Sequence, residues 1–317
     1  MKGKITFYIK NRHITFKFDL ERNVTVLTGD SGTGKTKLIN MVRMYSREGK
    51  ASGVTLKCAC PCIVLEGNNW ETILDNTTRT VVFVEESTSF LKSKEFAGKI
   101  QKTDNYYVLV TREKLSQIPY SIESIKKIVK NNSKPVIEKE YKNLSVKSIS
   151  EFPYEEVVVE DSKAGFCFFS KACEKLSVRC YSSNGKSNIL FELRKSKANR
   201  ILVIADAAAL GPEINELVQF KERSGKEIDF YLPECFEWLA LRSAIFSGNR
   251  HVNEVLSNPV DHIESRDYFS WERFFLWLLV DESKDRTKLR YPKNKGKLPS
   301  GYLIEANMDS ILNAMKK

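Results

Sequence analysis

The sequence predicts an α/β fold built as two successive α/β domains. Three observations predict it. Strand-length apolar runs alternate with segments of helical periodicity, a glycine-rich turn leads from one of these strands straight into a helix, and two later apolar runs each end in a carboxylate. At 317 residues, with 42% hydrophobic and 11% aromatic residues, the chain is long enough for two ordinary cores. We place the boundary near Ser148, with a first domain over residues 1–148 and a second over residues 149–317.

The first domain is expected to begin with an antiparallel hairpin, because residues 4–9 and 14–20 alternate in the β sense around a short polar turn. A strand over residues 24–28, the glycine-rich turn and a helix over residues 35–47 follow. Further strands are predicted over residues 62–65, 80–84 and 106–110, with a helix over residues 89–100. Such alternation predicts a mainly parallel sheet covered by helices. Residues 121–150 then change to lysine-rich, β-prone segments.

The second domain is expected to open with a strand over residues 157–159, a helix over residues 166–176 and a strongly apolar strand over residues 201–205. Its later part is helical and aromatic. We assign its aromatic side chains to the core rather than to a base-stacking platform, because WERFFLWLL is apolar around most of a helix. These residues are Trp238, Trp271, Phe274, Phe275 and Trp277.

The charge balance favours an acidic partner. Lys and Arg number 51 against 40 Asp and Glu, a formal net charge of +11, which suits nucleic acid without identifying it. Basic residues gather in one run near the end, and two interpretations stay open for it: a solvated loop or contacts with a phosphate backbone. The run comprises Lys284, Arg286, Lys288, Arg290, Lys293, Lys295 and Lys297.

No stretch approaches the roughly 20 apolar residues that span a bilayer, and the first residues lack the apolar core of a signal peptide. We therefore expect no membrane association and a cytoplasmic location, where the seven cysteines would be reduced. The cluster Cys58, Cys60 and Cys62 lacks CxxC spacing and a nearby histidine, so we interpret it as buried strand thiols and assign it no metal.

The segment GDSGTGKT satisfies the pattern GxxxxGK[ST] of a phosphate-binding loop, or P-loop, between a predicted strand and a predicted helix. Backbone N–H groups must converge there on phosphate oxygens, which side chains at the glycines would obstruct. Lys35 would add a cation at the β and γ phosphates, and Thr36 a hydroxyl ligand for Mg²⁺. The other interpretation is a glycine-rich turn that only caps a helix. The expected nucleotide-binding residues are Gly29, Asp30, Ser31, Gly32, Thr33, Gly34, Lys35 and Thr36.

Two carboxylates follow the strand over residues 80–84, as expected where an acid lies beside the metal and the attacking water. Either Glu85 holds Mg²⁺ and Glu86 orients the water, or one of them does both; a solvated strand end is the alternative. Thr111 and Arg112 follow the strand over residues 106–110 and are candidate sensors of the γ-phosphate. A surface ion pair is the other role open to Arg112.

The hairpin that leads into the P-loop strand resembles ATPases of the ATP-binding-cassette type over residues 1–148, although no LSGGQ-like segment is present. The resemblance implies that the domain binds ATP with Mg²⁺ and hydrolyses it, using Lys35, Glu85 and Glu86. A head-to-tail ATP sandwich does not follow without the signature segment.

In the second domain, Glu160 and Asp206 each end an apolar strand, and two acids at one sheet edge can share Mg²⁺. This pattern is similar to the TOPRIM domain of topoisomerases, primases and the ATPase-linked nucleases of bacterial phage defence. The resemblance matches Glu160 to the strand-end glutamate and Asp206 to the first acid of the DxD pair. Asp161 replaces the usual glycine, and Ala208 replaces the second acid.

Glu234 and Glu237 are three residues apart, a spacing that places both on neighbouring helix surface. They either supply the missing carboxylate or form an ordinary acidic first turn of a helix.

These observations predict an ATPase whose nucleotide state controls a TOPRIM-like effector directed at nucleic acid. Two alternatives stay open. One is a nucleotide-gated switch with an inactive second domain that recruits a protein partner or a second copy of the chain, which Ala208 favours. The other is a small-molecule kinase, because P-loops serve that chemistry too.

Overall fold

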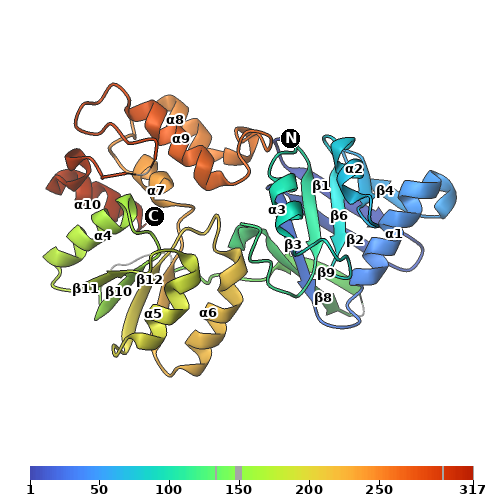
Figure 1. Ribbon diagram of the computed structural model, residues 1–317, viewed down its shortest axis with the longest axis horizontal. Coiled ribbons are helices and arrows are strands. Elements are labelled where there is room, and N and C mark those ends of the chain that lie inside the picture. The colour runs from blue at the N-terminus through green and yellow to red at the C-terminus, as the bar shows by residue number, and fades with distance from the viewer. Residues whose placement is uncertain (133, 147–151, 295, 317) are drawn as a thin grey trace. The chain divides into compact units, whose positions relative to one another are not determined.

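The computed structural model describes residues 1–132, 134–146, 152–294 and 296–316. The chain forms two compact units, one of Met1–Lys142 with Pro259–Ser270 and one of Asn143–Asn258 with Trp271–Lys317 (Figure 1). The predicted boundary residue Ser148 lies outside the described residues. The sequence gives no sign that residues 259–270 return to the first unit. They are held there by hydrogen bonds such as that from the Gly3 N–H to the Val260 carbonyl, at 2.8 Å.

The first unit contains two sheets. The larger has the order β5-β6-β7-β3-β8-β9, in which only the β8–β9 pair is antiparallel, and the smaller is an antiparallel sheet of order β2-β1-β4. The strands are β1 (Ile5–Lys10), β2 (Thr15–Leu20), β3 (Val24–Gly29), β4 (Thr55–Lys57), β5 (Cys62–Val64), β6 (Val81–Glu85), β7 (Tyr106–Val110), β8 (Ile125–Asn131) and β9 (Lys134–Lys139). The predicted hairpin and mainly parallel sheet are confirmed.

Three helices complete this unit: α1 (Lys35–Glu48), α2 (Trp70–Asp75) and α3 (Lys94–Ile100). The helix predicted after the glycine-rich turn is confirmed as α1. The helix predicted over residues 89–100 begins only at Lys94, because the Ser93 side chain caps it by accepting the Phe96 N–H at 3.0 Å. Neither β4 nor α2 is predicted, since both are too short to show a period.

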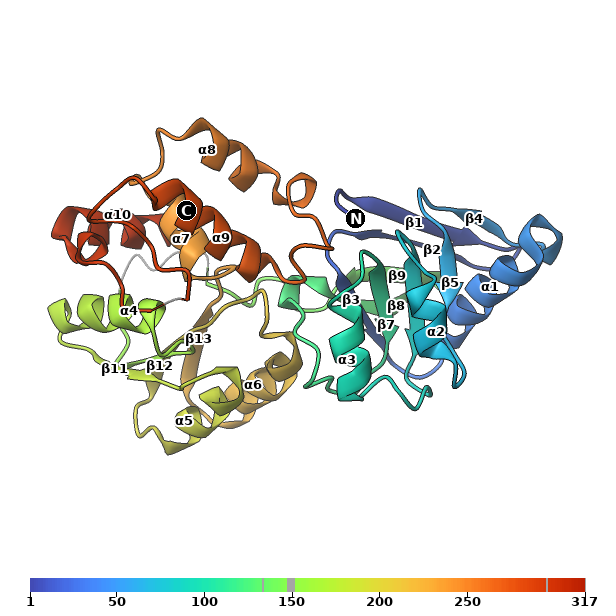
Figure 2. The same cartoon turned by 45° about the horizontal axis from the view of Figure 1, so that its top comes forward.

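Two apolar layers enclose the larger sheet. On one face α1 and the smaller sheet pack against it, with the rings of Phe7 and Phe83 at 5.0 Å. On the other face α2 and α3 cover it (Figure 2). There Phe96 of α3 meets Tyr107 of β7 edge to face at 6.2 Å. The sheet is thus buried on both faces, which leaves its strand ends as the accessible polar surface.

The second unit has a four-stranded, fully parallel sheet of order β11-β10-β12-β13. Its strands are β10 (Glu156–Val159), β11 (Arg179–Ser182), β12 (Arg200–Ile204) and β13 (Glu227–Tyr231). Its helices are α4 (Ala164–Lys175), α5 (Ile189–Lys195), α6 (Gly211–Arg223), α7 (Phe236–Arg242), α8 (Arg250–Ser257), α9 (Trp271–Ser283) and α10 (Glu305–Ala314). The α/β class and the helical later part are confirmed, whereas β11, β13, α5 and α6 are not predicted.

One part of the aromatic prediction is wrong. Phe274 and Phe275 are buried in the core beneath α9, but Trp277 is 46% exposed. The reason is geometric: Trp277 lies on the outward side of α9, and an apolar residue at the edge of a buried stripe need not face the core.

Candidate functional site

The glycine-rich turn adopts a backbone that only glycine accommodates well. Gly29, Gly32 and Gly34 have φ of +146°, +75° and +112°. A Cβ on Gly29 would lie 2.9 Å from both the Ile128 carbonyl oxygen and the Thr33 hydroxyl, and one on Gly34 would lie 3.2 Å from the Phe16 ring. The turn is therefore fixed by its neighbours in β8 and β2.

The turn delivers the chain into the N-terminus of α1. Gly34 is the residue before the helix, and no side chain caps this end or places an acid in its first turn among the described residues. The Leu38 N–H closes the first helical bond on the Gly34 carbonyl at 2.9 Å. The first N–H groups and the positive end of the helix dipole thus face the turn, an arrangement that favours an anion.

Lys35 folds back over this turn. Its ammonium group donates to the carbonyl oxygens of Gly29 and Asp30, the latter at 3.1 Å. Burial lowers the pKa of Lys35 and the Arg112 charge lowers it further, while the carboxylates of Glu86 and Asp30 raise it. Charges from β6, β7 and the turn therefore act on one ammonium group.

The strand register explains this convergence. Leu27 pairs with Val110, and Val110 pairs with Glu85, so these three residues form one row across β3, β7 and β6. The chain crosses from β3 to the β5 edge, returns through β6 and β7, and passes to β8 on the other side of β3. The strand order reverses beside β3, and in open α/β sheets ligands bind at the carboxyl ends of strands at such a point.

Glu86 and Arg112 lie together at this edge. The Glu86 carboxylate accepts the Arg112 N–H at 3.1 Å, and the guanidinium group lies 4.0 Å from it. Arg112 is exposed and Glu86 is half-buried, so the pair is largely screened by solvent and adds little to stability. Thr111 is fully buried, and its hydroxyl accepts the Glu113 N–H at 2.9 Å. Of the two residues that follow β7, Arg112 is thus the accessible one.

Glu85 points the other way, because successive side chains of a strand lie on opposite faces. Its carboxylate is 3.9 Å from the guanidinium group of Arg43 on α1, which also binds Glu66 at 2.8 Å. Thr36 is exposed in the first turn of α1. Sequence reasoning missed Arg43 and Glu66; the four-residue spacing of Arg43 and Arg47, which both bind Glu66, was the available signal.

The second unit brings its two predicted acids to one edge. Val159 pairs with Ile204, so β10 and β12 end side by side, and the Asp206 N–H donates to the Glu160 carboxylate at 3.3 Å. The strand order also reverses here, because β11 and β12 lie on opposite sides of β10. Across the described residues, no group of three or more His, Cys, Asp or Glu side chains could hold a metal ion.

The residues that depart from the TOPRIM pattern have structural roles. Asp161 caps α4, accepting the N–H groups of Lys163 at 3.0 Å and Gly165 at 2.6 Å. Ala208 is 3% exposed, and Glu237 is buried in the first turn of α7, where it accepts the Tyr291 hydroxyl at 2.8 Å. Burial raises the pKa of Tyr291 well above its usual value.

All seven cysteines have free thiols. The Cys62 thiol donates to the Cys60 carbonyl at 3.6 Å, and its proximity to Cys58 lowers the pKa of Cys58 to about 6 and raises that of Cys62. Cys62 is buried in β5, but Cys58 and Cys60 are half-buried in the turn between β4 and β5, so the prediction of buried strand thiols is wrong for these two. Burial raises the pKa of Cys60. Cys58 is therefore the most acidic thiol of the cluster.

Among the described residues, no helix has the length and apolar character needed to cross a membrane. The chain matches no model of a known protein family, and no curated protein is similar to it.

Proposed function

We propose that the first unit binds ATP with Mg²⁺ and hydrolyses it, and that its nucleotide state controls a second unit directed at nucleic acid. One observation carries the proposal: the glycine-rich turn between β3 and α1 lies at the point where strand order reverses, with Lys35, Glu86 and Arg112 acting on one another there. A turn that only capped a helix would need neither the lysine nor the neighbouring acid.

The binding role falls to the turn and to α1. Gly29, Gly32 and Gly34 keep Cβ atoms away from the phosphates, and the first N–H groups of α1 face them. The Lys35 ammonium group donates hydrogen bonds to carbonyl oxygens of the turn. A bound phosphate would replace these carbonyls as the acceptor, because its oxygens are charged and form stronger hydrogen bonds. The exposed Thr36 hydroxyl would bind Mg²⁺, whose chemistry is to neutralise charge between the phosphates.

The hydrolytic role falls to Glu86 rather than Glu85. The Glu86 carboxylate, which follows β6, raises the pKa of Lys35 and so faces the lysine. From this position it would orient the attacking water. Glu85 is held beside Arg43, which places it toward α1 and suits a metal or positioning role. Arg112 lies within 4.0 Å of Glu86 and would stabilise charge that develops on the γ-phosphate.

The experiment is calorimetric titration of ATP with Mg²⁺ into the wild type and into Lys35→Ala, with Lys37→Ala as the matched control on the exposed side of α1. Loss of a charge-assisted contact should weaken binding by about 1.5 to 3 kcal/mol, roughly tenfold or more. Lys37→Ala should bind as the wild type does. Equal loss in both variants, or none in Lys35→Ala, would contradict the proposal.

The nucleic-acid role rests on the net charge of +11 and on the two acids at the edge of β10 and β12. Glu160 and Asp206 would hold Mg²⁺ together with waters, because Mg²⁺ commonly uses one or two carboxylates. Titration of Mn²⁺ as a paramagnetic substitute should show a site that Asp206→Asn loses. An unchanged site in that variant would exclude Asp206 as a ligand.

A nucleotide-gated interaction switch is the second candidate, and Ala208 favours it. Its side chain is 3% exposed, so the position of the second DxD acid is part of the core. The two candidates differ in cleavage: Mg²⁺-dependent cutting of DNA or RNA that Glu160→Gln abolishes would support the nuclease, whereas ATP binding with no cutting under any condition would support the switch.

A further inference from the structure

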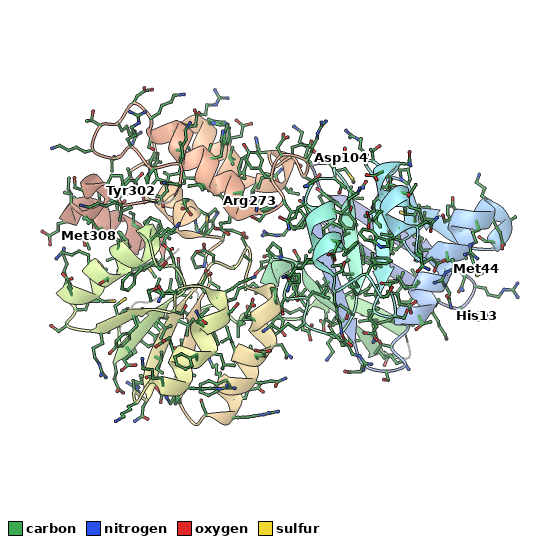
Figure 3. All side chains as sticks on the ribbon, in the orientation of Figure 1. His13, Met44, Asp104, Arg273, Tyr302 and Met308 are labelled. Atoms are coloured by element: carbon green, nitrogen blue, oxygen red, sulfur yellow. The ribbon has the colours of Figure 1, made fainter. Side chains whose placement is uncertain are left out.

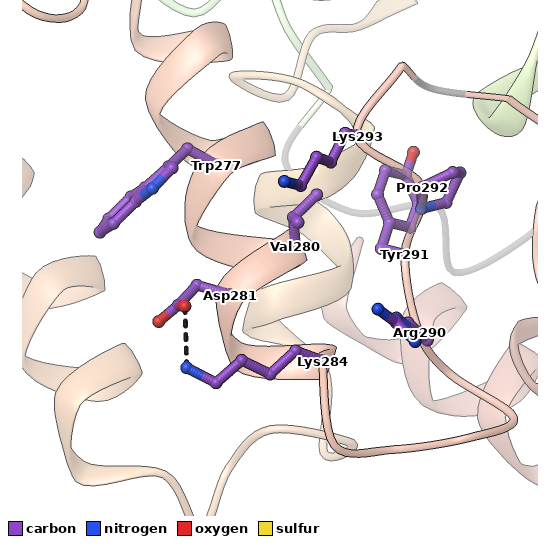
Figure 4. Close-up of a pocket in the computed structure, with 8 residues that line it drawn as sticks. All are labelled: Trp277, Val280, Asp281, Lys284, Arg290, Tyr291, Pro292 and Lys293. Atoms are coloured by element: carbon purple, nitrogen blue, oxygen red, sulfur yellow. Dashed lines mark hydrogen bonds and ion pairs between the residues drawn. The ribbon is translucent and has the colours of Figure 1, made fainter.

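A cavity of about 700 Å³ lies in the second unit, where α9 faces the basic run that follows it. Helix α9 contributes Trp277, Val280, Asp281 and Lys284, and the loop contributes residues 290–293 (Figure 4). The volume falls in the range of small-molecule and nucleotide pockets. None of these residues belongs to the Glu160 and Asp206 edge described above.

The lining combines an aromatic surface with positive charge. Trp277 is 46% exposed, so part of its indole surface is accessible to a ligand. Lys284, Arg290 and Lys293 are exposed cations that line the same cavity, and the single carboxylate of the lining, Asp281, pairs with Lys284 at 3.0 Å. Arg290 and Lys293 take part in no ion pair within the described part of the chain. Figure 4 shows the Lys293 ammonium pointing toward α9.

Part of the basic run, residues 286–291, is held in place by contacts of its backbone and side chains. Arg286 stacks on Phe246 at 4.7 Å and donates to the Ile245 carbonyl at 2.8 Å. The Lys288 carbonyl accepts the Gly301 N–H at 3.0 Å, and a Cβ on Gly301 would lie 2.3 Å from that oxygen. The loop between these anchors and Tyr291 is thus tied down at several points.

Tyr291 is the third anchor. Its N–H donates to the Ser283 hydroxyl at 2.9 Å, and its own hydroxyl donates to Glu237. Its ring lies 5.9 Å from that of the fully buried Tyr302, which is labelled in Figure 3. The cations on either side of Tyr291 are therefore presented from a fixed backbone, which lowers the entropic cost of binding.

We infer that this cavity binds single-stranded nucleic acid, with one base stacked on Trp277 and neighbouring phosphates on Lys284, Arg290 and Lys293. An aromatic platform beside backbone-tracking cations is the general mode of single-strand binding. A duplex is disfavoured because its bases are already paired and stacked on one another, so none is available to stack on Trp277. The inference deepens the proposed function and rests on its claim that the second unit is directed at nucleic acid.

The test measures fluorescence anisotropy of a short labelled single strand, as DNA and as RNA, without ATP or Mg²⁺. Trp277→Ala should weaken binding roughly 5- to 150-fold, the range for loss of one stacked base, and Trp277→Phe should retain most of it. Arg290→Gln and Lys293→Gln should each reduce the salt slope by about one. Lys288→Gln, an exposed cation of the same loop outside the cavity, is the matched control and should change the slope less.

Several outcomes would overturn the inference. Trp277→Ala that folds, as judged by thermal unfolding, and binds the strand as the wild type does removes the stacking role. Equal affinity for a mononucleotide and the strand would reassign the cavity to free nucleotide, and tighter binding of a duplex would exclude single strands.

The controls keep this inference separate from the proposed function. Lys35→Ala should lose ATP binding yet keep the strand affinity measured without ATP. Strand binding that none of the cavity variants alters would leave a nucleic-acid role standing and refute this cavity. Absence of any binding to DNA or RNA would refute both.

Discussion

Both units place a strand, a turn and a helix where the strand order of a parallel sheet reverses, yet the two helix ends differ. In the first unit, β3 leads through glycines of positive φ into α1, whose first turn holds no acid and no side-chain cap among the described residues. In the second, β10 leads into α4, and Asp161 occupies the N–H groups of Lys163 and Gly165. The N-terminus of α1 can therefore bind an external anion, whereas the N-terminus of α4 is already occupied by the Asp161 carboxylate.

The difference teaches where each unit can take a ligand. A carboxylate fixed at the N-terminus of α4 satisfies the N–H groups and the dipole that would otherwise attract a phosphate. What remains in the second unit is the pair of acids at the strand ends, which suits a cation. Equivalent positions in two α/β sheets thus favour opposite charges.

The largest expected effect is on the rate of ATP hydrolysis in the first unit, where the N-terminus of α1 is open. Glu86→Gln keeps the size of the side chain but removes its charge, so ATP hydrolysis should fall by about 10²- to 10⁴-fold while ATP binding persists. Phosphate release under single-turnover conditions measures it. Glu85→Gln is the companion variant: if it slows turnover as much and Glu86→Gln does not, the roles of the two acids are reversed.

The next effect concerns the backbone of the glycine-rich turn. Gly29→Ala places a Cβ 2.9 Å from the Ile128 carbonyl at a φ of +146°, so it should lower the free energy of unfolding by about 1 to 3 kcal/mol. Gly98→Ala is the control, because a Cβ there meets nothing within 4 Å inside α3 and should stabilise by about 0.5 to 1 kcal/mol. Urea unfolding measures both, and equal effects would show that the turn is not strained.

A smaller effect is expected at the capped helix of the second unit. Asp161→Ala leaves two N–H groups without their acceptor and should destabilise by about 1 kcal/mol. Asp161→Asn should cost less, because an amide keeps one acceptor oxygen. Thermal unfolding separates the variants. If Asp161→Ala is neutral in stability, the contrast between the two helix ends has no energetic basis.

The uncapped N-terminus of α1 could be predicted from the sequence, whereas the capped N-terminus of α4 could not. The local chemistry of GDSGTGKT predicts a turn between a strand and a helix. The spacing of apolar residues on either side predicts β3 and α1, and apolar runs further on predict β6 and β7. Asp161 could be recognised only as a departure from a pattern. Its role as a cap depends on where α4 begins, and helix boundaries are the least certain feature of a sequence.

The remaining surprises depend on tertiary packing. Trp277 has the same apolar neighbours in sequence as Phe274 and Phe275, and only the contacts of α9 decide which of them is exposed. Residues 259–270 join the first unit through bonds such as that from the Asn23 amide to the Ser265 carbonyl, at 3.0 Å, between groups 242 residues apart in the chain. No local pattern encodes such a contact.

The smallest expected effect is a difference in reactivity between two cysteines, one in each unit. In each, a neighbouring thiol lowers the pKa of one cysteine: Cys62 acts on Cys58, and Cys180 on Cys173. Cys58 is half-buried and its pKa is about 6, whereas Cys173 is 4% exposed. Alkylation by iodoacetamide in the folded protein should therefore label Cys58 and spare Cys173.

The sign of the pH dependence follows from the depressed pKa. Below pH 6 Cys58 is a thiol and reacts slowly, and its rate should rise to a plateau as pH passes through about 6. Cys62→Ala removes the neighbouring thiol that lowers the pKa of Cys58. The pH of half-maximal rate should therefore move toward about 8.5, the pKa of a free cysteine. The rate at neutral pH should fall only about two- to threefold, because a more basic thiolate is also a better nucleophile. A midpoint that stays near 6 in Cys62→Ala would mean that another group stabilises the thiolate.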